Sequence, residues 1–257
     1  MVDYSSIDQS EALSYIFYPR REQSSPPADA FDVAVSVADN VSVSCRFYGG
    51  QKSWPWILFF HGNGEIVSDY DGIAPFYAKN GLNLVVADYR GYGASTGTPT
   101  LTDLFKDAHV IFKAVREELA ARGCDPLLWV MGRSLGSLSA IELASRSGNE
   151  IEGLIIESGF ANVLRIMIHL GLSVYNLNVE AVDEESFDVL RTISLPTLII
   201  HGEEDRLVPL REAETVYDHI GARDKRLVVI PGADHNDIMF VGLKRYFEAL
   251  RQFVVQS

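Results

Sequence analysis

The chain has 257 residues, in which 22 lysines and arginines face 35 aspartates and glutamates, so its formal net charge is −13. This acidic balance argues against nucleic-acid binding, which needs clustered lysines and arginines, and two cysteines are too few for a disulfide framework or a cysteine-rich zinc site. Hydrophobic residues make up 47% of the chain, as is usual for a soluble globular protein with a substantial core.

The N-terminal region predicts a short helical segment and then a β-hairpin. Residues 8–18 have a helix-like pattern, and the Ser-Ser-Pro-Pro sequence at residues 24–27 separates them from the next segment. Residues 31–37 and 41–48 alternate apolar and small polar side chains around an Asp-Asn pair. This alternation on both sides of a turn sequence predicts two antiparallel strands.

The rest of the chain alternates between two kinds of segment. Short, nearly continuous apolar runs predict strands buried on both faces, as in a parallel sheet; they lie at residues 56–60, 82–87, 127–131, 151–156, 197–200 and 226–230. Apolar residues spaced by three or four predict helices; these lie at residues 101–122, 134–147, 209–220 and 237–254. The alternation predicts an α/β fold, a doubly wound and mostly parallel sheet of about eight strands with the antiparallel hairpin at its N-terminal edge.

One connection, at residues 159–193, is longer than the others. It has an apolar half, residues 163–177, and an acidic half, residues 180–188. In a compact domain, an insert of this length is more often functional than idle. We therefore predict a single domain over residues 1–257, with a small cap at about 159–193.

No segment has the pattern of a signal peptide or a membrane span. Residues 1–10 carry acid and serine where a secretory signal would carry a basic region and an apolar run. The most apolar long stretch, residues 163–175, contains Arg165 and His169 and falls well short of the roughly 20 residues that a span needs. We expect a soluble, cytoplasmic protein without integral membrane contact.

A Gly-Arg-Ser-Leu-Gly sequence at residues 132–136 directly follows a predicted strand and opens a predicted helix. A serine on so sharp a strand-to-helix turn is held in a strained backbone, and the flanking glycines remove side chains that would clash there. The Gly-x-Ser-x-Gly pattern is weak alone, and its place between strand and helix strengthens it. Ser134 is therefore the candidate nucleophile, with Arg133 expected at the surface or bonded to a loop.

A serine nucleophile needs a base. His235 lies in the loop after the last predicted strand, which makes it the candidate. His61 and His201 also end strands, but each is followed by glycine, a pattern better suited to a tight turn. His109 and His219 fall within predicted helices, where a solvated or core role is more usual.

The base needs an acid to orient it, and this acid should follow a late strand. Asp205 does so, in a loop before the helix predicted from residue 209. Glu203 and Glu204 are rivals in the same loop, although charges there are usually solvated. Glu157, at the end of the preceding predicted strand, is a weaker rival.

An oxyanion hole needs two backbone N–H groups aimed at one point. The N–H of Leu135, directly after the candidate nucleophile, is one candidate. The other should come from the glycine-rich loop after residue 60, where Asn63 is the candidate and Gly64 the alternative. In the apolar part of the cap, Met167 and His169 could line an acyl pocket, and ordinary packing over the sheet is an equally good interpretation.

Several motifs in order carry a resemblance to a known family. They are His-Gly-Asn-Gly at 61–64, Asp-Tyr-Arg-Gly-Tyr-Gly at 88–93, Gly-Arg-Ser-Leu-Gly at 132–136, Asp205 with Val-Pro at 208–209, and His-Asn-Asp at 235–237. The chain resembles the α/β-hydrolase superfamily, namely its esterases and thioesterases and its serine aminopeptidase-like hydrolases. The chain order Ser134, Asp205, His235 is the order of that superfamily and differs from those of chymotrypsin and subtilisin.

The resemblance implies the α/β-hydrolase fold, a catalytic triad of Ser134, Asp205 and His235, and Asn63 and Leu135 as oxyanion donors. The eukaryotic proteins that the chain looks like include membrane-associated depalmitoylating thioesterases, and we expect no cysteine-rich N-terminal anchor of their kind here. In the second motif, Asp88 and Arg90 are expected mainly to tie loops together.

We therefore expect a serine hydrolase that cleaves carboxylic ester or thioester bonds of a small-molecule acyl substrate through an acyl-enzyme, with no cofactor. The alternatives are a serine peptidase of the same fold and a non-catalytic binding protein. A metal hydrolase is disfavoured because no metal-ligand spacing is present, and an aspartate-nucleophile dehalogenase because Ser134 holds the elbow. Acyl-CoA is a less favoured substrate because its polyphosphate would meet a strongly acidic protein.

Overall fold

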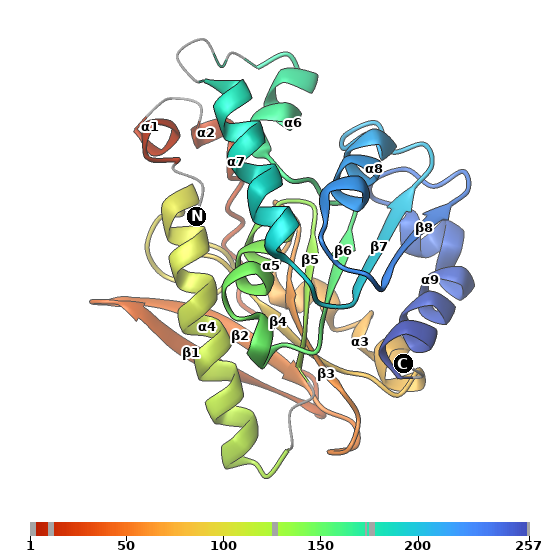
Figure 1. Ribbon diagram of the computed structural model, residues 1–257. Helices are drawn as coiled ribbons and strands as arrows, with labels where there is room; N and C mark the ends of the chain where they lie inside the picture. The colour runs from red at the N-terminus through yellow and green to blue at the C-terminus, as the bar shows by residue number, and fades with distance from the viewer. Residues whose placement is uncertain (1–3, 10–12, 125–127, 173, 175–177, 256–257) are drawn as a thin grey trace.

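An eight-stranded sheet forms the centre of the molecule (Figure 1). The computed structural model describes residues 4–9, 13–124, 128–172, 174 and 178–255. The strands are β1 (Ala30–Ala38), β2 (Val41–Tyr48), β3 (Trp56–Phe60), β4 (Asn83–Ala87), β5 (Leu128–Arg133), β6 (Gly153–Glu157), β7 (Thr197–Gly202) and β8 (Lys225–Ile230). Their order across the sheet is β1-β2-β4-β3-β5-β6-β7-β8. Residue 127, where a strand was predicted to begin, lies outside the described residues.

The sheet confirms the predicted fold class. From β4 to β8 every pair of neighbours is parallel, and β2 runs antiparallel to both β1 and β4. The hairpin between β1 and β2 turns at Asn40, whose φ of 58° lies in the left-handed region that asparagine tolerates. Strands β3 to β7 are buried along their whole length, whereas exposed residues alternate with half-buried or buried ones along most of β1 at the edge. This difference explains why the central runs are continuously apolar and the edge alternates.

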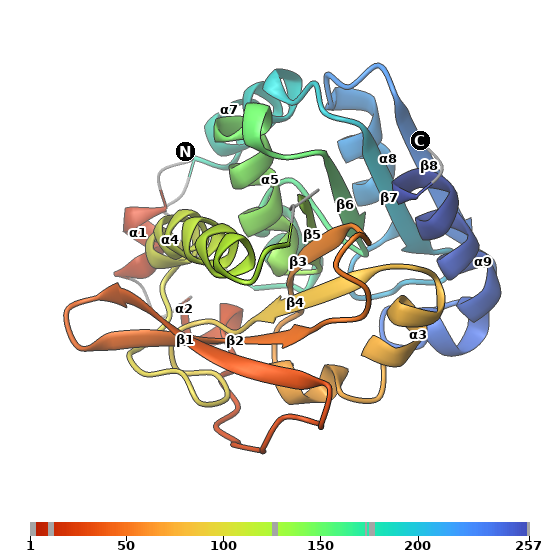
Figure 2. The ribbon, with the colours of Figure 1, turned by 90° about the horizontal axis from the view of Figure 1, so that it is seen from below.

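Helices cover both faces of the sheet (Figures 1 and 2). One face carries α4 (Leu101–Ala121), α5 (Gly136–Arg146), α7 (Val179–Thr192) and α8 (Leu210–His219), whose apolar side chains join one core cluster. The other carries α3 (Ala74–Lys79) and α9 (Ile238–Val254), which contribute to a second cluster. Short 3₁₀ turns lie at Val67–Tyr70 and Gly148–Glu150. The sequence pattern did not predict α3, whose six residues are too few for a clear helical period.

The predicted N-terminal helix is replaced by two short turns, α1 (Ser5–Asp8) and α2 (Leu13–Ile16), and residues 10–12 between them lie outside the described residues. Both turns have a tertiary role. The carboxylate of Asp8 accepts hydrogen bonds from the N–H groups of Leu101 (2.7 Å) and Thr102 (3.0 Å), so it caps the distant helix α4. After α2 the chain leaves the helix because its backbone bonds to the loop after β3.

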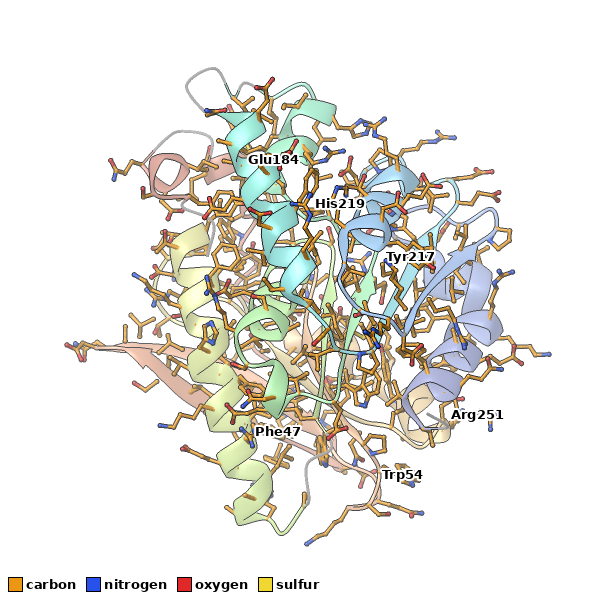
Figure 3. All side chains as sticks on the ribbon, viewed as in Figure 1. Phe47, Trp54, Glu184, Tyr217, His219 and Arg251 are labelled. Carbon is orange, nitrogen blue, oxygen red and sulfur yellow. The ribbon has the colours of Figure 1, made fainter. Side chains whose placement is uncertain are left out.

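The connection between β6 and β7 contains α6 (Val163–His169) and α7. Asn162 caps α6 by accepting a hydrogen bond from Leu164 N–H (2.9 Å). The acidic helix α7 packs against α5 and α8 and extends the helical layer, while α6 lies at its upper end (Figure 1). His219, at the end of α8, lies beside α7 (Figure 3). Its ring stacks on that of Phe187 in α7, with centroids 4.0 Å apart. A separate cap over residues 159–193 stays a prediction, and residues 173 and 175–177 of its apolar half lie outside the described residues.

None of the helices in the described ranges combines the length and the apolar character needed to cross a bilayer.

Candidate active site

Ser134 stands on a strained turn at the end of β5. Its φ of 51° is in the left-handed region, and its N–H donates to the carbonyl oxygen of Glu157 on β6 (2.9 Å). A Cβ on Gly132 would lie 2.2 Å from the Gly136 oxygen, and one on Gly136 would lie 2.1 Å from the Phe60 oxygen. Only glycine therefore fits two residues before and two residues after the serine, which explains the Gly-x-Ser-x-Gly pattern.

Asp205 and His235 meet at the carboxyl edge of the sheet, from the loops after β7 and β8. Nδ1 of His235 lies 2.7 Å from Oδ2 of Asp205. The other oxygen, Oδ1, accepts hydrogen bonds from the N–H groups of Leu207 (3.0 Å) and Val208 (2.8 Å). Both side chains are buried. An ionised carboxylate in this position makes Nδ1 the protonated nitrogen and leaves Nε2 as the basic one.

The rival acids do not reach His235. Glu203 and Glu204 are exposed, and Glu203 accepts a hydrogen bond from Gly232 N–H (3.1 Å). Glu157 is buried and bonds to Arg133 and Tyr246 instead. Of the acids considered from the sequence, Asp205 is the one bonded to the imidazole.

His201, near the end of β7, contacts the loop that carries Asp205. It is completely buried, and its Nε2 lies 2.7 Å from the Val208 oxygen and 3.4 Å from Asp205 Oδ2. Burial lowers the pKa of His201 below its ordinary value, so the ring is neutral near pH 7. The glycine that follows His201 predicted only a tight turn, whereas His201 lies in the interior of the protein.

Arg133 links the serine turn to the histidine loop. Its Nη2 donates to the backbone oxygen of His235 (2.8 Å) and to Oδ1 of Asn236 (3.0 Å). Among the described residues, no hydrogen bond joins the Ser134 hydroxyl to the His235 ring, and such contacts often form fully only when substrate binds. Arg133 was expected either at the surface or bonded to a loop, and it is buried and bonded to the loop after β8.

The two expected oxyanion donors lie in the loop after β3 and at the start of α5. The Asn63 side chain is bonded at both of its polar atoms: Oδ1 accepts from Tyr92 Oη (2.6 Å) and Tyr18 N–H (2.8 Å), and Nδ2 donates to the Ile16 oxygen (2.8 Å). Within the described ranges, the backbone N–H groups of Asn63 and Leu135 donate no hydrogen bond. The Leu135 N–H precedes the first turn of α5, where a helix leaves such donors without a partner.

A protein-family model described as "Serine aminopeptidase, S33" matches residues 52–172 and 184–239, which include all of these loops. The chain belongs to this family of α/β hydrolases. Among similar proteins, human alpha/beta hydrolase domain-containing protein 17B is 29% identical over 205 residues, which cover 78% of this chain and 66% of that protein, slightly less than two thirds. Mouse alpha/beta hydrolase domain-containing protein 17C is 29% identical over 232 residues, which cover 88% of this chain and 68% of that protein.

Solved structures of esterases share the fold of this S33-family chain. The Pyrococcus furiosus esterase Pf2001 superposes with a TM-score of 0.74 at 20% identity, covering 93% of this chain and 98% of that one. Est1E from Butyrivibrio proteoclasticus, solved with ferulic acid bound, superposes with a TM-score of 0.70 at 18% identity, covering 87% of this chain and 98% of that one. At these identities the likeness concerns the fold.

The two residues expected to line an acyl pocket have protein partners in this S33-family structure. Met167, on α6, is buried in the core cluster to which this helix contributes. His169 is exposed, with Nε2 2.9 Å from the Arg206 oxygen and Nδ1 3.2 Å from Nη2 of Arg211. The His169 contact joins the end of α6 to the Asp205 loop, and a role of either residue in substrate binding stays a prediction.

Asp88 ties the loop after β4 to the loop after β3, as expected, whereas Arg90 ties its loop to helix α4. Asp88 is fully buried; its Oδ1 lies 3.1 Å from Nε2 of His61 and accepts from Val67 N–H (2.9 Å). Arg90 forms a two-pronged pair with Asp107, with both distances 2.7 Å. The part of the chain that the structure describes contains no cluster of three or more His, Cys, Asp or Glu side chains placed to bind a metal.

Proposed function

We propose that this S33-family protein is a serine hydrolase that cleaves carboxylic ester or thioester bonds through an acyl-enzyme intermediate. Ser134 Oγ attacks the carbonyl carbon while Nε2 of His235 takes the hydroxyl proton, and Asp205 stabilises the imidazolium that forms. The N–H groups of Asn63 and Leu135 stabilise the oxyanion.

His235 acts as an acid to complete acylation and then again as a base in deacylation. The imidazolium of His235 gives its proton to the leaving alkoxide or thiolate, and the acyl group stays on Ser134. His235 then takes a proton from water, whose oxygen attacks the acyl carbon; collapse of this second oxyanion releases the acid and returns the proton to Ser134. Every proton therefore passes through one nitrogen, which is why the ring needs a fixed orientation.

The observation that carries the proposal is the 2.7 Å bond between His235 and Asp205, on the same sheet edge as the strained Ser134 turn. A non-catalytic protein would have no need to keep a glycine-flanked serine at φ 51° on the sheet edge that also carries a paired imidazole. The substrate class we propose is a small-molecule ester or thioester, consistent with the esterases that share the fold.

Peptide hydrolysis is a second candidate, favoured by the family description as serine aminopeptidases. The same acyl transfer would apply, with an amine as the leaving group. A peptidase has to protonate that amine before it leaves, so an amide and an ester of the same acyl group distinguish the two candidates.

The test combines covalent labelling with a substrate panel. A fluorophosphonate probe should label the protein at Ser134, and Ser134→Ala should abolish labelling and lower ester turnover by about 10⁶-fold. The panel contains esters and thioesters of graded acyl length and aminoacyl anilides. Turnover unchanged by Ser134→Ala would refute the serine mechanism, and turnover of the anilides alone would favour the peptidase.

A further inference from the structure

Arg133 has an unusual environment for a residue beside a candidate nucleophile. It is the last residue of β5, directly before Ser134, and its guanidinium is buried. It has partners on three separate segments: the loop after β3, strand β6 and the loop after β8. No step of the proposed reaction uses this side chain.

Two carboxylates fix one side of the guanidinium. Its Nε donates to Oε1 of Glu157 (3.2 Å), and its Nη1 bonds to Oε1 of Glu65. Burial by itself lowers the pKa of Arg133, and the two carboxylates raise it above its ordinary value, so the group stays charged.

Both carboxylates are themselves held in place. Oε2 of Glu157 accepts from the Tyr246 hydroxyl (2.6 Å), while Oε2 of Glu65 accepts from the N–H of Gly62 (2.7 Å) and the hydroxyl of Tyr70 (2.8 Å). The guanidinium therefore has little freedom to move, because each of its anchors is bonded at a second atom.

The remaining nitrogen, Nη2, donates to the His235 oxygen (2.8 Å) and to Asn236 Oδ1 (3.0 Å). The His235 backbone is thus bonded to the side chain of the residue that precedes Ser134. The contact of His235 with Asp205 fixes the ring at Nδ1, while this contact fixes the loop from which the ring extends.

We propose that Arg133 is a positioning residue that sets the distance between the His235 ring and the Ser134 hydroxyl. The inference rests on the proposed function, because it concerns the proton transfer between those two groups. A planar guanidinium can satisfy both carboxylates and the carbonyl at once, whereas an ammonium cannot reach all of them in this fixed geometry. Arg133→Lys therefore keeps the charge and loses the positioning.

The decisive experiment compares Arg133→Lys with Arg46→Lys. Arg46 is a matched control because it is also buried and also joins two carboxylates, Asp32 and Asp71, but it lies on β2 and forms no hydrogen bond or ion pair with Ser134, Asp205 or His235. Ester turnover and the rate of fluorophosphonate labelling are measured per folded molecule, with folding checked by thermal unfolding.

We expect Arg133→Lys to lower kcat and the labelling rate by about 10- to 100-fold with little change in KM, since small misplacements of reacting groups cost about this much. Arg46→Lys should keep the wild-type kcat. In a His235→Ala background, Arg133→Lys should cause no further loss, because Arg133 acts through His235. If Arg133→Lys does not fold, Glu65→Gln, which weakens one anchor, takes its place with the same pattern expected at smaller size.

Three results would overturn the inference. Arg133→Lys could have the same kcat as the Arg46→Lys control, or it could change KM alone. It could also lower kcat as much in the His235→Ala background as in the wild-type protein. Failure of the proposed function looks different. In that case the wild-type protein itself neither turns over esters nor is labelled at Ser134.

Discussion

Nδ1 of His235 and Oδ2 of Asp205 lie 2.7 Å apart, although 30 residues separate them in the chain. Asp205 is the fixed partner of the two, because two backbone N–H groups hold its other oxygen. The carboxylate therefore determines which ring nitrogen carries the proton and how the ring is turned. A change at Asp205 should accordingly alter catalysis through the imidazole.

Asp205→Asn should lower kcat by about 10⁴-fold while the fold persists, because an amide can donate to Nδ1 and so favours the wrong tautomer. The measurement is ester turnover, with unfolding by urea as the check on folding. Glu204→Gln, an exposed neighbour in the same loop, is the control and should keep wild-type turnover. Equal turnover of the two variants would contradict the role assigned to Asp205.

Gly132→Ala should destabilise the protein by about 1–3 kcal/mol, the usual cost of forcing extra atoms into a packed site. The reason is that the added Cβ would lie 2.2 Å from the Gly136 oxygen, where backbone must move. Gly72→Ala is the matched control, since its Cβ would meet nothing within 4 Å. Urea unfolding measures both, and equal free energies of unfolding would show that the serine turn is not tightly packed.

Tyr92→Phe should lower kcat by less than the roughly 10²-fold cost of losing an oxyanion donor, because it loosens Asn63 without removing its N–H. The Tyr92 hydroxyl donates to Oδ1 of Asn63 (2.6 Å) and accepts from Tyr18 N–H (2.8 Å). Tyr48→Phe is the control, because it also removes a hydroxyl, one that bonds to Val67 and Asp71 and not to Asn63. We expect kcat to fall only in Tyr92→Phe, and a parallel fall in both variants would mean that Tyr92 acts on stability alone.

Stability should decline as the pH falls below about 6.5, and His201 should account for part of the decline. Burial lowers the pKa of His201 from its ordinary value of 6.5, so the unfolded chain takes up a proton that the folded protein does not. The stabilisation is therefore present above pH 6.5 and is lost as the pH falls towards the folded-state pKa, with a slope of at most about 1.4 kcal/mol per pH unit.

The free energy of unfolding, measured from pH 7.5 to pH 5, tests this linkage. His201→Asn should flatten the decline, while His169→Asn, at an exposed position, should leave it unchanged. An identical pH dependence of His201→Asn and the wild-type protein would show that His201 does not carry the linkage.

The sequence predicted the strands well because buried parallel strands are marked by continuous apolar runs. The predicted run at residues 56–60 coincides with β3, and the helix predicted at 101–122 differs from α4 by one residue. The N-terminal segment differed more, because tertiary hydrogen bonds to Asn63 and to α4 override a weak local helical pattern. Short α3 carried too little periodicity to be found.

Local sequence determined the serine turn and the order of the candidate residues, because the steric demand for glycine at 132 comes from Gly136 and Ser137 in the same turn. The demand for glycine at 136 is tertiary, since it comes from the Phe60 oxygen on β3. Local sequence did not determine the contacts of Arg133, whose partners Glu65 and Glu157 lie on segments far along the chain. It favoured Asp205 over Glu203 and Glu204 in the same loop, but only the fold turns the Asp205 carboxylate towards His235. Such contacts depend on how the strands align side by side in the sheet, and a linear pattern of residue types contains no record of that alignment.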